Sequence, residues 1–316
     1  MDRFAEEVRR GLSATPKFLL PHYFYDALGS ALFGAICELP EYYVTRAEIE
    51  ILTRHAAEIA AALGEPARLV ELGSGSARKS RLLIEALLSQ QDELEYMPVD
   101  VDPSVLESSS RMLLDEFAEL TIHAVCADFR DPAIALSDIS PDDGLRTVVL
   151  FLGSSIGNLD FEAAVSMLAS LRTLLSPGDA LFLGADLKKS KAVLEPAYDD
   201  PLGVTAAFNL NLLGRINREL GGNFDLAAFA HRAFYNEAEG RIEMHLVSRR
   251  AQSVRVGADT FSFAEGESIH TENSYKYDEA TLDAIAARAG YRIERRWTDS
   301  RAWFADVLMR VAPQNE

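Results

Sequence analysis

The side chains best suited to chemistry follow three apolar runs of the sequence. Residues 67–80, ARLVELGSGSARKS, pass from an apolar run through Gly73 and Gly75 into an amphipathic stretch. A glycine turn between a strand and a helix lets the backbone approach a nucleotide-like cofactor closely. Two glycines alone are a weak signal, because many turns of this kind carry them for packing.

The next two runs each end in an acidic residue that would suit such a cofactor. Asp100 closes the second run about 25 residues past the glycines, where a carboxylate can hold both hydroxyls of a ribose. Asp128 and Phe129 close the third, and offer an acceptor for an exocyclic amine and a ring for an adenine face. A dinucleotide-binding turn would have a third glycine where Arg78 stands, while Glu71 is typical of methyltransferases that use S-adenosylmethionine (AdoMet). The set favours AdoMet over NAD, although either aspartate alone could cap a helix.

The elements that position these residues alternate between strand and helix from Leu69 to Leu187. The predicted strands are LVEL, EYMPVDVD, IHAVCADF, TVVLFLG and DALFLGADL, and helical patterns lie at 79–89, 103–118 and 160–175. This alternation predicts an α/β fold, a Rossmann-like parallel sheet with helices on both faces. The fourth strand leads into a second glycine- and serine-rich turn, FLGSSIGNL, at the edge where open α/β folds bind ligands. Alternatively, that segment begins a helix capped by Asn158 or Asp160.

The alternation stops after Leu187. Residues 188–276 contain a helical pattern at 204–220 and then alternating stretches that predict antiparallel hairpins. The last two strands, YRIERRWTD and WFADVLMRV, predict the antiparallel hairpin that completes a class I methyltransferase sheet. We therefore predict an AdoMet-binding methyltransferase domain of residues 48–187 and 277–316. Residues 1–47 and 188–276 would form an inserted α+β substrate-binding domain.

The segment before the first strand is rich in aromatic residues. They include Tyr23, Phe24, Tyr25, Tyr42 and Tyr43. Such a segment predicts a packed core, which general experience favours, or a lid whose tyrosines meet a substrate. Thr45 and Glu48 follow with the spacing of a capping box, which predicts that a helix begins there and continues to Gly64.

Composition limits the partners and the site chemistry. The 49 acidic and 31 basic side chains give a net charge of −18, which argues against nucleic acid or an anionic membrane as the partner. The two cysteines, Cys37 and Cys126, lack a partner motif, which fits a reducing cytoplasm and excludes a thiolate metal site. The six histidines show no HxxxH or HxH spacing, so no histidine-based metal site is expected. No apolar run reaches the roughly 18 residues that span a bilayer.

Six segments together resemble the histidine Nα-methyltransferases of ergothioneine biosynthesis. They are LPEYYVTRAEIEIL, LVELGSGSARKS, PVDVD, FLGSSIGN, YDDPLGVTAAFN and IHTENSYKY, and the similarity runs from Tyr23 to Val311. The resemblance implies an enzyme that methylates L-histidine stepwise to Nα,Nα,Nα-trimethylhistidine (hercynine), with AdoMet as the methyl donor and no metal. We expect a cytoplasmic monomer that acts on this small molecule.

The resemblance also implies an AdoMet site. Its residues would be Tyr43, Gly73, Lys79, Asp100, Asp128 and Phe129. Gly73 would face the methionine portion, Lys79 would neutralise the carboxylate of AdoMet, and Tyr43 would contact the same end. The two aspartates and the phenylalanine would hold the ribose and the adenine, as their places after the strands indicate.

A second implied site would bind the amino-acid substrate. Its residues would be Tyr25, Asn158, Tyr198, Met244, Glu272 and Ser274. Asn158 and Tyr198 would grip the α-amino and α-carboxylate groups, and Tyr25 would reach the reacting amine through a water. Glu272 and Ser274 would be the partners of the imidazole. The resemblance implies that the first three would be the catalytic residues. An activated methyl group needs little beyond in-line placement of an unprotonated nitrogen, which suits these residue types.

Three alternatives stay open. A methyltransferase of the same family could act on another amino acid, although an indole N–H would leave Ser274 idle beside Glu272. An NAD-dependent oxidoreductase fits the strand and helix pattern but not Arg78. A non-catalytic AdoMet-binding module would be excluded by turnover with histidine.

Overall fold

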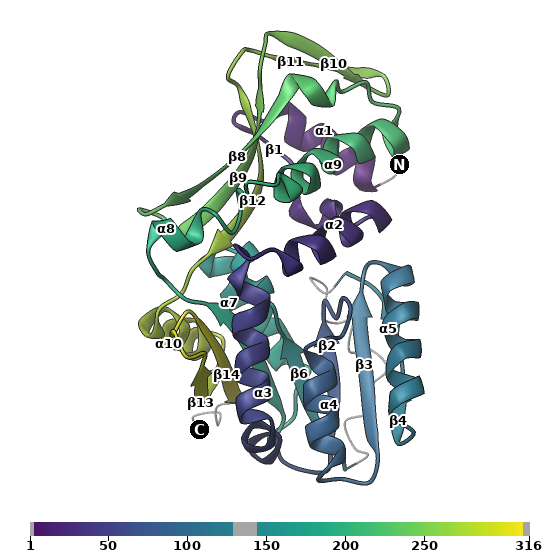
Figure 1. The fold of residues 1–316 in the computed structure, drawn as a ribbon, viewed down its shortest axis with the longest axis vertical. Coiled ribbons are helices and arrows are strands. Elements are labelled where there is room, and N and C mark those ends of the chain that lie inside the picture. The colour runs from purple at the N-terminus through teal and green to yellow at the C-terminus, as the bar shows by residue number, and fades with distance from the viewer. Residues whose placement is uncertain (1–2, 129–143, 312–316) are drawn as a thin grey trace. The chain divides into compact units, whose positions relative to one another are not determined.

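A computed structural model describes residues 3–128 and 144–311 of the chain. The chain divides into two units. The first comprises Met1–Tyr43 and Lys189–Tyr275, and the second comprises Val44–Lys188 and Lys276–Glu316 (Figure 1). The breaks fall after residues 43, 188 and 275, against predicted boundaries after 47, 187 and 276.

The second unit is built on an eight-stranded sheet in the order β13-β14-β7-β6-β2-β3-β4, with β5 also beside β3. Its strands are β2 (Ala67–Leu72), β3 (Leu94–Asp100), β4 (Leu120–Ile122), β5 (Val125–Cys126), β6 (Arg146–Phe151), β7 (Ala180–Asp186), β13 (Tyr291–Thr298) and β14 (Phe304–Val311). Strands β2 to β7 pair in parallel, whereas β14 pairs antiparallel with both β7 and β13. This topology confirms the predicted α/β sheet and its closing antiparallel hairpin. Strand β2 lies between β3 and β6, at the switch point where open α/β sheets bind ligands.

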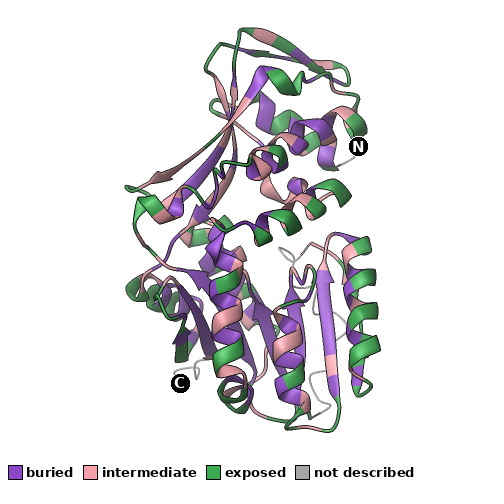
Figure 2. Ribbon diagram, in the orientation of Figure 1, coloured by how far each residue is buried: buried purple, intermediate pink, exposed green. Residues whose placement is uncertain are grey.

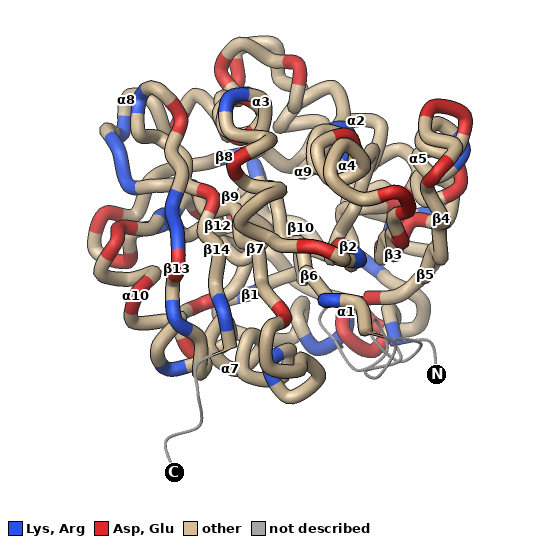
Figure 3. Tube along the Cα trace, turned by 90° about the horizontal axis from the view of Figure 1, so that it is seen from below, with Lys and Arg blue, Asp and Glu red and all other residues tan. Residues whose placement is uncertain are grey.

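Helices cover both faces of this sheet. They are α3 (Tyr43–Leu63), α4 (Ser80–Leu88), α5 (Pro103–Glu116), the 3₁₀ helix η2 (Ser155–Asn158), α7 (Phe161–Arg172) and α10 (Glu279–Arg288). Helices α3, α4 and α5 lie on one face and α7 and α10 on the other (Figures 1 and 3). Every residue of β2 and β7 is therefore buried (Figure 2). Strands covered on both sides produce continuous apolar runs such as LVEL.

One edge of the sheet is β13, which carries a row of charges. Arg292, Glu294, Arg295 and Arg296 are exposed along it, and Figure 3 shows basic residues spaced along this strand. Charged side chains on an edge strand hinder pairing with a second sheet. The edge is therefore protected although its backbone groups are unpaired on one side.

The first unit contains a four-stranded sheet in the order β1-β12-β9-β8 and a separate hairpin of β10 and β11. Its strands are β1 (Lys17–Phe18), β8 (Phe229–Asn236), β9 (Arg241–Ser248), β10 (Gln252–Val256), β11 (Asp259–Phe263) and β12 (Ser268–Tyr275). Its helices are α1 (Arg3–Ser13), η1 (Pro21–Phe24), α2 (Ala27–Glu38), α8 (Lys191–Leu194), α9 (Val204–Leu220) and η3 (Leu226–Ala228). The antiparallel pairing of β8, β9 and β12 confirms the predicted hairpins, and α9 packs against β8 and β9.

Two local predictions are wrong. Helix α3 begins at Tyr43 and not at a capping box, so Thr45 lies in its first turn and Glu48 is fully buried. The carboxylate of Glu48 is held by groups distant in sequence, which a local spacing rule does not anticipate. The stretch IHAVCADF is not one strand, because β4 and β5 are separated by two residues outside any strand. Asp160, and not Asn158, caps α7 by accepting a hydrogen bond from Ala163 N at 2.8 Å.

Within residues 3–128 and 144–311, every helix is too short or too polar to span a membrane.

Candidate active site

The glycine turn after β2 folds back onto the end of β3. Gly73 and Gly75 have φ angles of 74° and 51°, a region that glycine enters without steric cost. Gly73 N donates to Val99 O at 2.8 Å, and Gly75 N donates to Asp100 Oδ2 at 2.9 Å. The structure thus brings together the two glycines and the aspartate that the sequence singles out. Between the glycines, Ser74 Oγ is buried and has no hydrogen-bond partner among the described residues.

The carboxyl group of Asp100 is held by backbone donors at the carboxyl edge of the sheet. Its second oxygen, Oδ1, accepts from Asp102 N at 3.0 Å. Burial raises the pKa of Asp100, and the N–H groups of Gly75 and Asp102 act in the opposite direction. Asp102 itself caps α5 by accepting from Ser104 N at 3.0 Å.

The third strand also ends beside Asp100. Ala127 follows β5 and its N donates to Asp100 O at 3.0 Å, so the half-buried Asp128 comes one residue after a contact with the end of β3. Its predicted role at the adenine stays a prediction. Phe129 lies outside the described residues.

Lys79 forms an ion pair with Glu48, the residue that the sequence predicted to be part of a capping box. Lys79 Nζ lies 2.8 Å from Glu48 Oε2, and Glu48 Oε1 accepts from Gly153 N at 2.9 Å. Gly153 belongs to the second glycine-rich turn, so Glu48 connects that turn to the residue predicted to neutralise the AdoMet carboxylate. Asp306 is fully buried nearby, and burial followed by the charge of Glu48 raises its pKa well above the ordinary value.

Glu71 faces the interior of the second unit. It is buried, and both Ser80 Oγ and Tyr96 OH donate to its Oε2. Burial raises the pKa of Glu71 to about 7, although these two hydrogen bonds act to lower it. Glu71 therefore anchors the base of the glycine turn to α4 and β3.

In the first unit, the predicted imidazole partners lie beside a tyrosine. Tyr198 OH and Ser274 Oγ are hydrogen-bonded at 2.8 Å, and both residues are buried. Glu272 and Met244 are opposite each other in the pairing of β12 with β9. Four of the predicted substrate residues are thus gathered on or beside one sheet.

A chain of aromatic rings extends from this group to Tyr25. The rings of Tyr198 and Tyr42 are 6.0 Å apart, those of Tyr42 and Phe33 are 6.1 Å apart, and those of Phe33 and Tyr25 are 5.7 Å apart. Burial raises the pKa of Tyr42 far above its ordinary value, and negative charge on Tyr198, Cys37, Tyr25 or Glu272 acts in the same direction.

Tyr42 therefore lies among the predicted substrate residues, although sequence reasoning left it unassigned. The signal was present in the Tyr42-Tyr43 doublet of the segment LPEYY. Packing accounts for much of the aromatic segment, since Phe24, Tyr42 and Tyr43 are buried.

Two predicted contacts join residues of different units and remain predictions. Asn158 is exposed at the end of η2 in the second unit, whereas its predicted partner Tyr198 belongs to the first. Tyr43, the last residue of the first unit, accepts a hydrogen bond from Lys189 Nζ at 2.8 Å. Its predicted partner is AdoMet, which the second unit is predicted to bind.

Comparison with known proteins places the chain among methyltransferases. The sequence pattern of a family described as histidine-specific, SAM-dependent methyltransferases matches residues 4–311. The chain belongs to this family. This confirms the resemblance indicated by the six sequence segments.

Two curated bacterial relatives match along most of their length. The histidine N-alpha-methyltransferase of Mycolicibacterium smegmatis is 46% identical over 295 residues, which cover 93% of this chain and 90% of that protein. That of Mycobacterium tuberculosis is 47% identical over 300 residues, covering 94% and 92%. Ergothioneine biosynthesis protein 1 of Schizosaccharomyces pombe is 27% identical over 291 residues, covering 90% of this chain and 38% of that protein.

The glycine turn fits the AdoMet used by this histidine-specific methyltransferase family. Gly73 and Gly75 allow close backbone approach, Ser74 Oγ is a buried polar atom with no partner among the described residues, and the Asp100 carboxylate closes the same turn. Lys79, predicted to meet the carboxylate of AdoMet, follows the same turn. AdoMet is therefore the methyl donor of this chain.

Proposed function

We propose that this chain methylates the α-amino nitrogen of L-histidine three times, producing hercynine for ergothioneine biosynthesis. The observation that supports the substrate best is the polar group of Tyr198, Glu272 and Ser274 at one end of the aromatic chain. It accompanies 46–47% identity with two histidine N-alpha-methyltransferases over nearly the whole chain. The second unit would be the AdoMet-binding domain and the first the substrate-binding domain.

The residues that would hold AdoMet are those around the glycine turn. Asp100 would accept from the ribose hydroxyls, Lys79 would pair with the carboxylate, and Asp128 with Phe129 would bind the adenine. When bound, AdoMet supplies a methyl group already activated by its positively charged sulfur.

The chain's own task is then to hold the amine and to favour its neutral form. A free amino acid is mostly protonated at neutral pH, and each pKa unit above the ambient pH costs about 1.4 kcal/mol. A neighbouring positive charge lowers the pKa of an ammonium group. Asn158 and Tyr198 would orient the α-amino and α-carboxylate groups, and Tyr25 would reach the amine through a water that can carry the proton away. No strong base among the side chains is needed.

Selectivity would come from hydrogen bonds to the ring. Glu272 would accept from one imidazole N–H, and Ser274, already oriented by Tyr198, would bond the other nitrogen. A site that hydrogen-bonds a polar group rejects analogues that lack the group far better than an apolar pocket rejects a size variant. Met244, opposite Glu272 in the sheet, would pack against the ring.

The expected partners are small molecules. A net charge of −18 argues against nucleic acid and anionic membranes. The two cysteines without a partner motif fit a reducing cytoplasm, and we propose a cytoplasmic monomer.

The proposal is tested by giving the purified chain AdoMet and all twenty amino acids together. Mass spectrometry of the products should show histidine carrying one, two and three methyl groups, and no other methylated amino acid. Methylation of a different amino acid would leave the family assignment intact and overturn the substrate. No methylation at all would favour a binding module without catalysis.

A further inference from the structure

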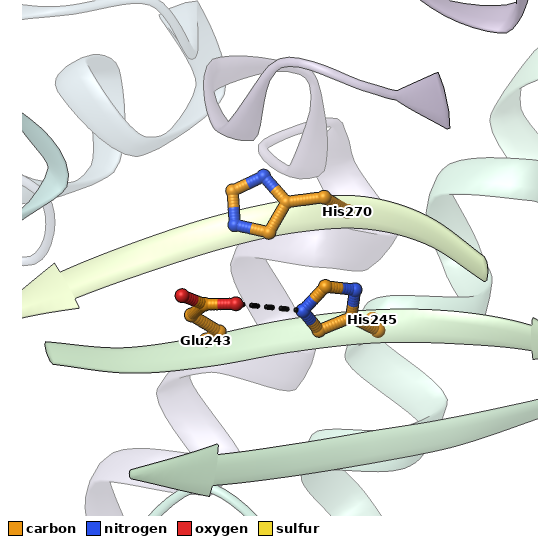
Figure 4. Close-up of side chains that lie close together, drawn as sticks. All are labelled: Glu243, His245 and His270. Carbon is orange, nitrogen blue, oxygen red and sulfur yellow. Dashed lines mark hydrogen bonds and ion pairs between the residues drawn. The ribbon is translucent and has the colours of Figure 1, made fainter. Parts of the chain in front are cut away.

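Three potential metal ligands lie together on the four-stranded sheet of the first unit. Glu243 and His245 are two residues apart on β9, and His270 is on the neighbouring strand β12 (Figure 4). One ligand atom from each residue lies within 4.8 Å of the corresponding atoms of the other two. Cys37 and Cys126 take no part, so the set consists of two imidazoles and one carboxylate.

A β-bulge creates this cluster. His270 pairs with His245, but after the bulge Glu272 pairs with Met244, so one residue of β12 has no paired residue on β9. Because side chains alternate between the faces of a strand, the extra residue moves His270 to the face that carries Glu243 and His245. Without the bulge, His270 would share the face of Met244 and Glu272. The cluster is therefore on the opposite face of the sheet from the predicted imidazole partners.

The carboxylate is held in place with one oxygen directed at the imidazole. Asn236 Nδ2 and Arg241 Nε each donate to Glu243 Oε1 at 2.9 Å, which leaves Oε2 facing His245 Nε2 at 3.1 Å. Burial acts to raise the pKa of Glu243, but the hydrogen bonds from Asn236, Arg241 and His245 outweigh it and hold the pKa at about 2. Glu243 Oε2 is therefore held beside the imidazole of His245.

Both imidazoles are partly buried. Burial lowers the pKa of His245 and of His270, and for His270 the neighbouring His245 contributes further. His245 Nδ1 is buried and has no hydrogen-bond partner among the described residues.

Neighbouring groups fix the ring orientations. His270 Nε2 is 2.9 Å from Asn273 Oδ1, and the ring of His245 is stacked on Phe234 with centroids 5.5 Å apart. Second partners of this kind orient histidine ligands at metal sites. Arg232 and Arg241 are the nearby cations, and Arg241 is already paired with Glu243.

We propose that Glu243, His245 and His270 bind one divalent transition-metal ion, with Zn²⁺ as the probe, and leave a further coordination position to water. Two imidazoles and a carboxylate are a ligand set that Zn²⁺ accepts in tetrahedral geometry, at about 2.0–2.2 Å from each atom. Glu243 Oε2 and His245 Nε2 are 3.1 Å apart, close enough for one ion to contact both. The contact between Glu243 Oε2 and His245 Nε2 marks where the cation would sit.

The ion would tie β9 to β12, the strands that carry Met244, Glu272 and Ser274. It would act on their rigidity and not on the methyl transfer, because it faces away from these residues. The proposed site departs from the expectation, drawn from histidine spacing, of no histidine-based metal site. The metal-site proposal does not depend on the proposed substrate, because the experiment that tests it measures metal binding.

The test uses the full chain stripped of metal with a chelator, then titrated with Zn²⁺ against a metal-sensitive dye. We expect one equivalent of tightly bound Zn²⁺ and a Zn²⁺-dependent rise in Tm. His245→Gln and His270→Gln should each weaken binding on the order of tenfold or more, and the pair of changes together should abolish it. The matched control is His55→Gln, which removes a histidine that also contacts a carboxylate, Glu58 at 3.3 Å, but has no second imidazole beside it among the described residues.

The proposal would be overturned if the double variant, with the circular dichroism spectrum of wild type, still bound one equivalent of Zn²⁺ tightly. A second measurement needs only the wild-type chain, in case a variant fails to fold. Co²⁺ should give intensified visible absorption that one equivalent of Zn²⁺ removes, and the spectrum of aqueous Co²⁺ alone would also overturn the proposal.

Discussion

Lys79 Nζ lies 2.8 Å from Oε2 of Glu48, a side chain with no exposed surface. The same carboxylate accepts hydrogen bonds from Gly153 N at 2.9 and 3.0 Å. One buried carboxylate therefore connects the helix α3, the start of α4 and the second glycine-rich turn. The cation predicted to meet AdoMet is positioned by this contact before any ligand arrives.

The first prediction concerns this ion pair. Lys79→Met should destabilise the chain by about 3 kcal/mol, because it leaves the buried Glu48 carboxylate without its cation. Combining it with Glu48→Gln should recover part of that loss, since no unpaired charge then remains. Urea unfolding of the two single variants and the double variant measures this coupling. A double variant that is less stable than Lys79→Met would show that the pair is not coupled as described.

The second prediction concerns the ribose. Asp100→Ala should weaken AdoMet binding by on the order of 2 kcal/mol, the loss expected of hydrogen bonds to a charged group. The glycine turn should loosen as well, because Gly75 N loses its acceptor. Calorimetry with Asp115→Ala, an exposed aspartate on α5, provides the control. Equal AdoMet affinity in both variants would remove Asp100 from the site.

The third prediction concerns the imidazole. Glu272→Ala should raise the KM for histidine well above the roughly tenfold that a single neutral hydrogen bond accounts for, with little change in AdoMet affinity. Glu265→Ala is the control, because Glu265 is an exposed carboxylate just before β12. Steady-state kinetics with varied histidine distinguishes the two. Unchanged histidine kinetics in Glu272→Ala would mean that the ring is bound elsewhere.

The fourth prediction concerns pH and Glu71. The folded carboxyl keeps its proton up to a pKa of about 7, against an ordinary value of 4.5. Between these values the unfolded chain binds fewer protons, so this group's contribution to stability falls as the pH rises, by up to about 3 kcal/mol. Glu71→Gln should remove that part of the pH dependence. Denaturant unfolding at pH 5 and pH 8 measures the free energy of unfolding at each pH. If that free energy changes equally between the two pH values in wild type and in Glu71→Gln, the assignment is refuted.

Much of the sheet could be predicted because its pattern is local. Strands such as β2 and β7 are buried throughout, so their apolar runs stand out, and glycines mark the turns that follow. Gly75 and Asp100 could be paired from sequence because each ends or follows a parallel strand, and such ends meet at one edge of the sheet.

What could not be predicted depends on tertiary contacts. Glu48 has the spacing of a capping residue, and only the folded chain shows that it meets Lys79 and Gly153. The approach of His270 to His245 depends on a one-residue bulge in β12, which no spacing rule between residues 25 apart can reveal. Tyr42 and Tyr43 are neighbours in sequence, and their separate surroundings emerge only from packing.

The most direct measurement is the structure of the product made from L-histidine and AdoMet by the purified chain. Mass spectrometry and proton NMR should identify hercynine, with all three methyl groups on the α-nitrogen and the imidazole unmodified. Nα,Nα-dimethylhistidine supplied in place of histidine should be converted to the same product. A methyl group on the ring, or accumulation of the dimethyl form without the trimethyl betaine, would contradict the account.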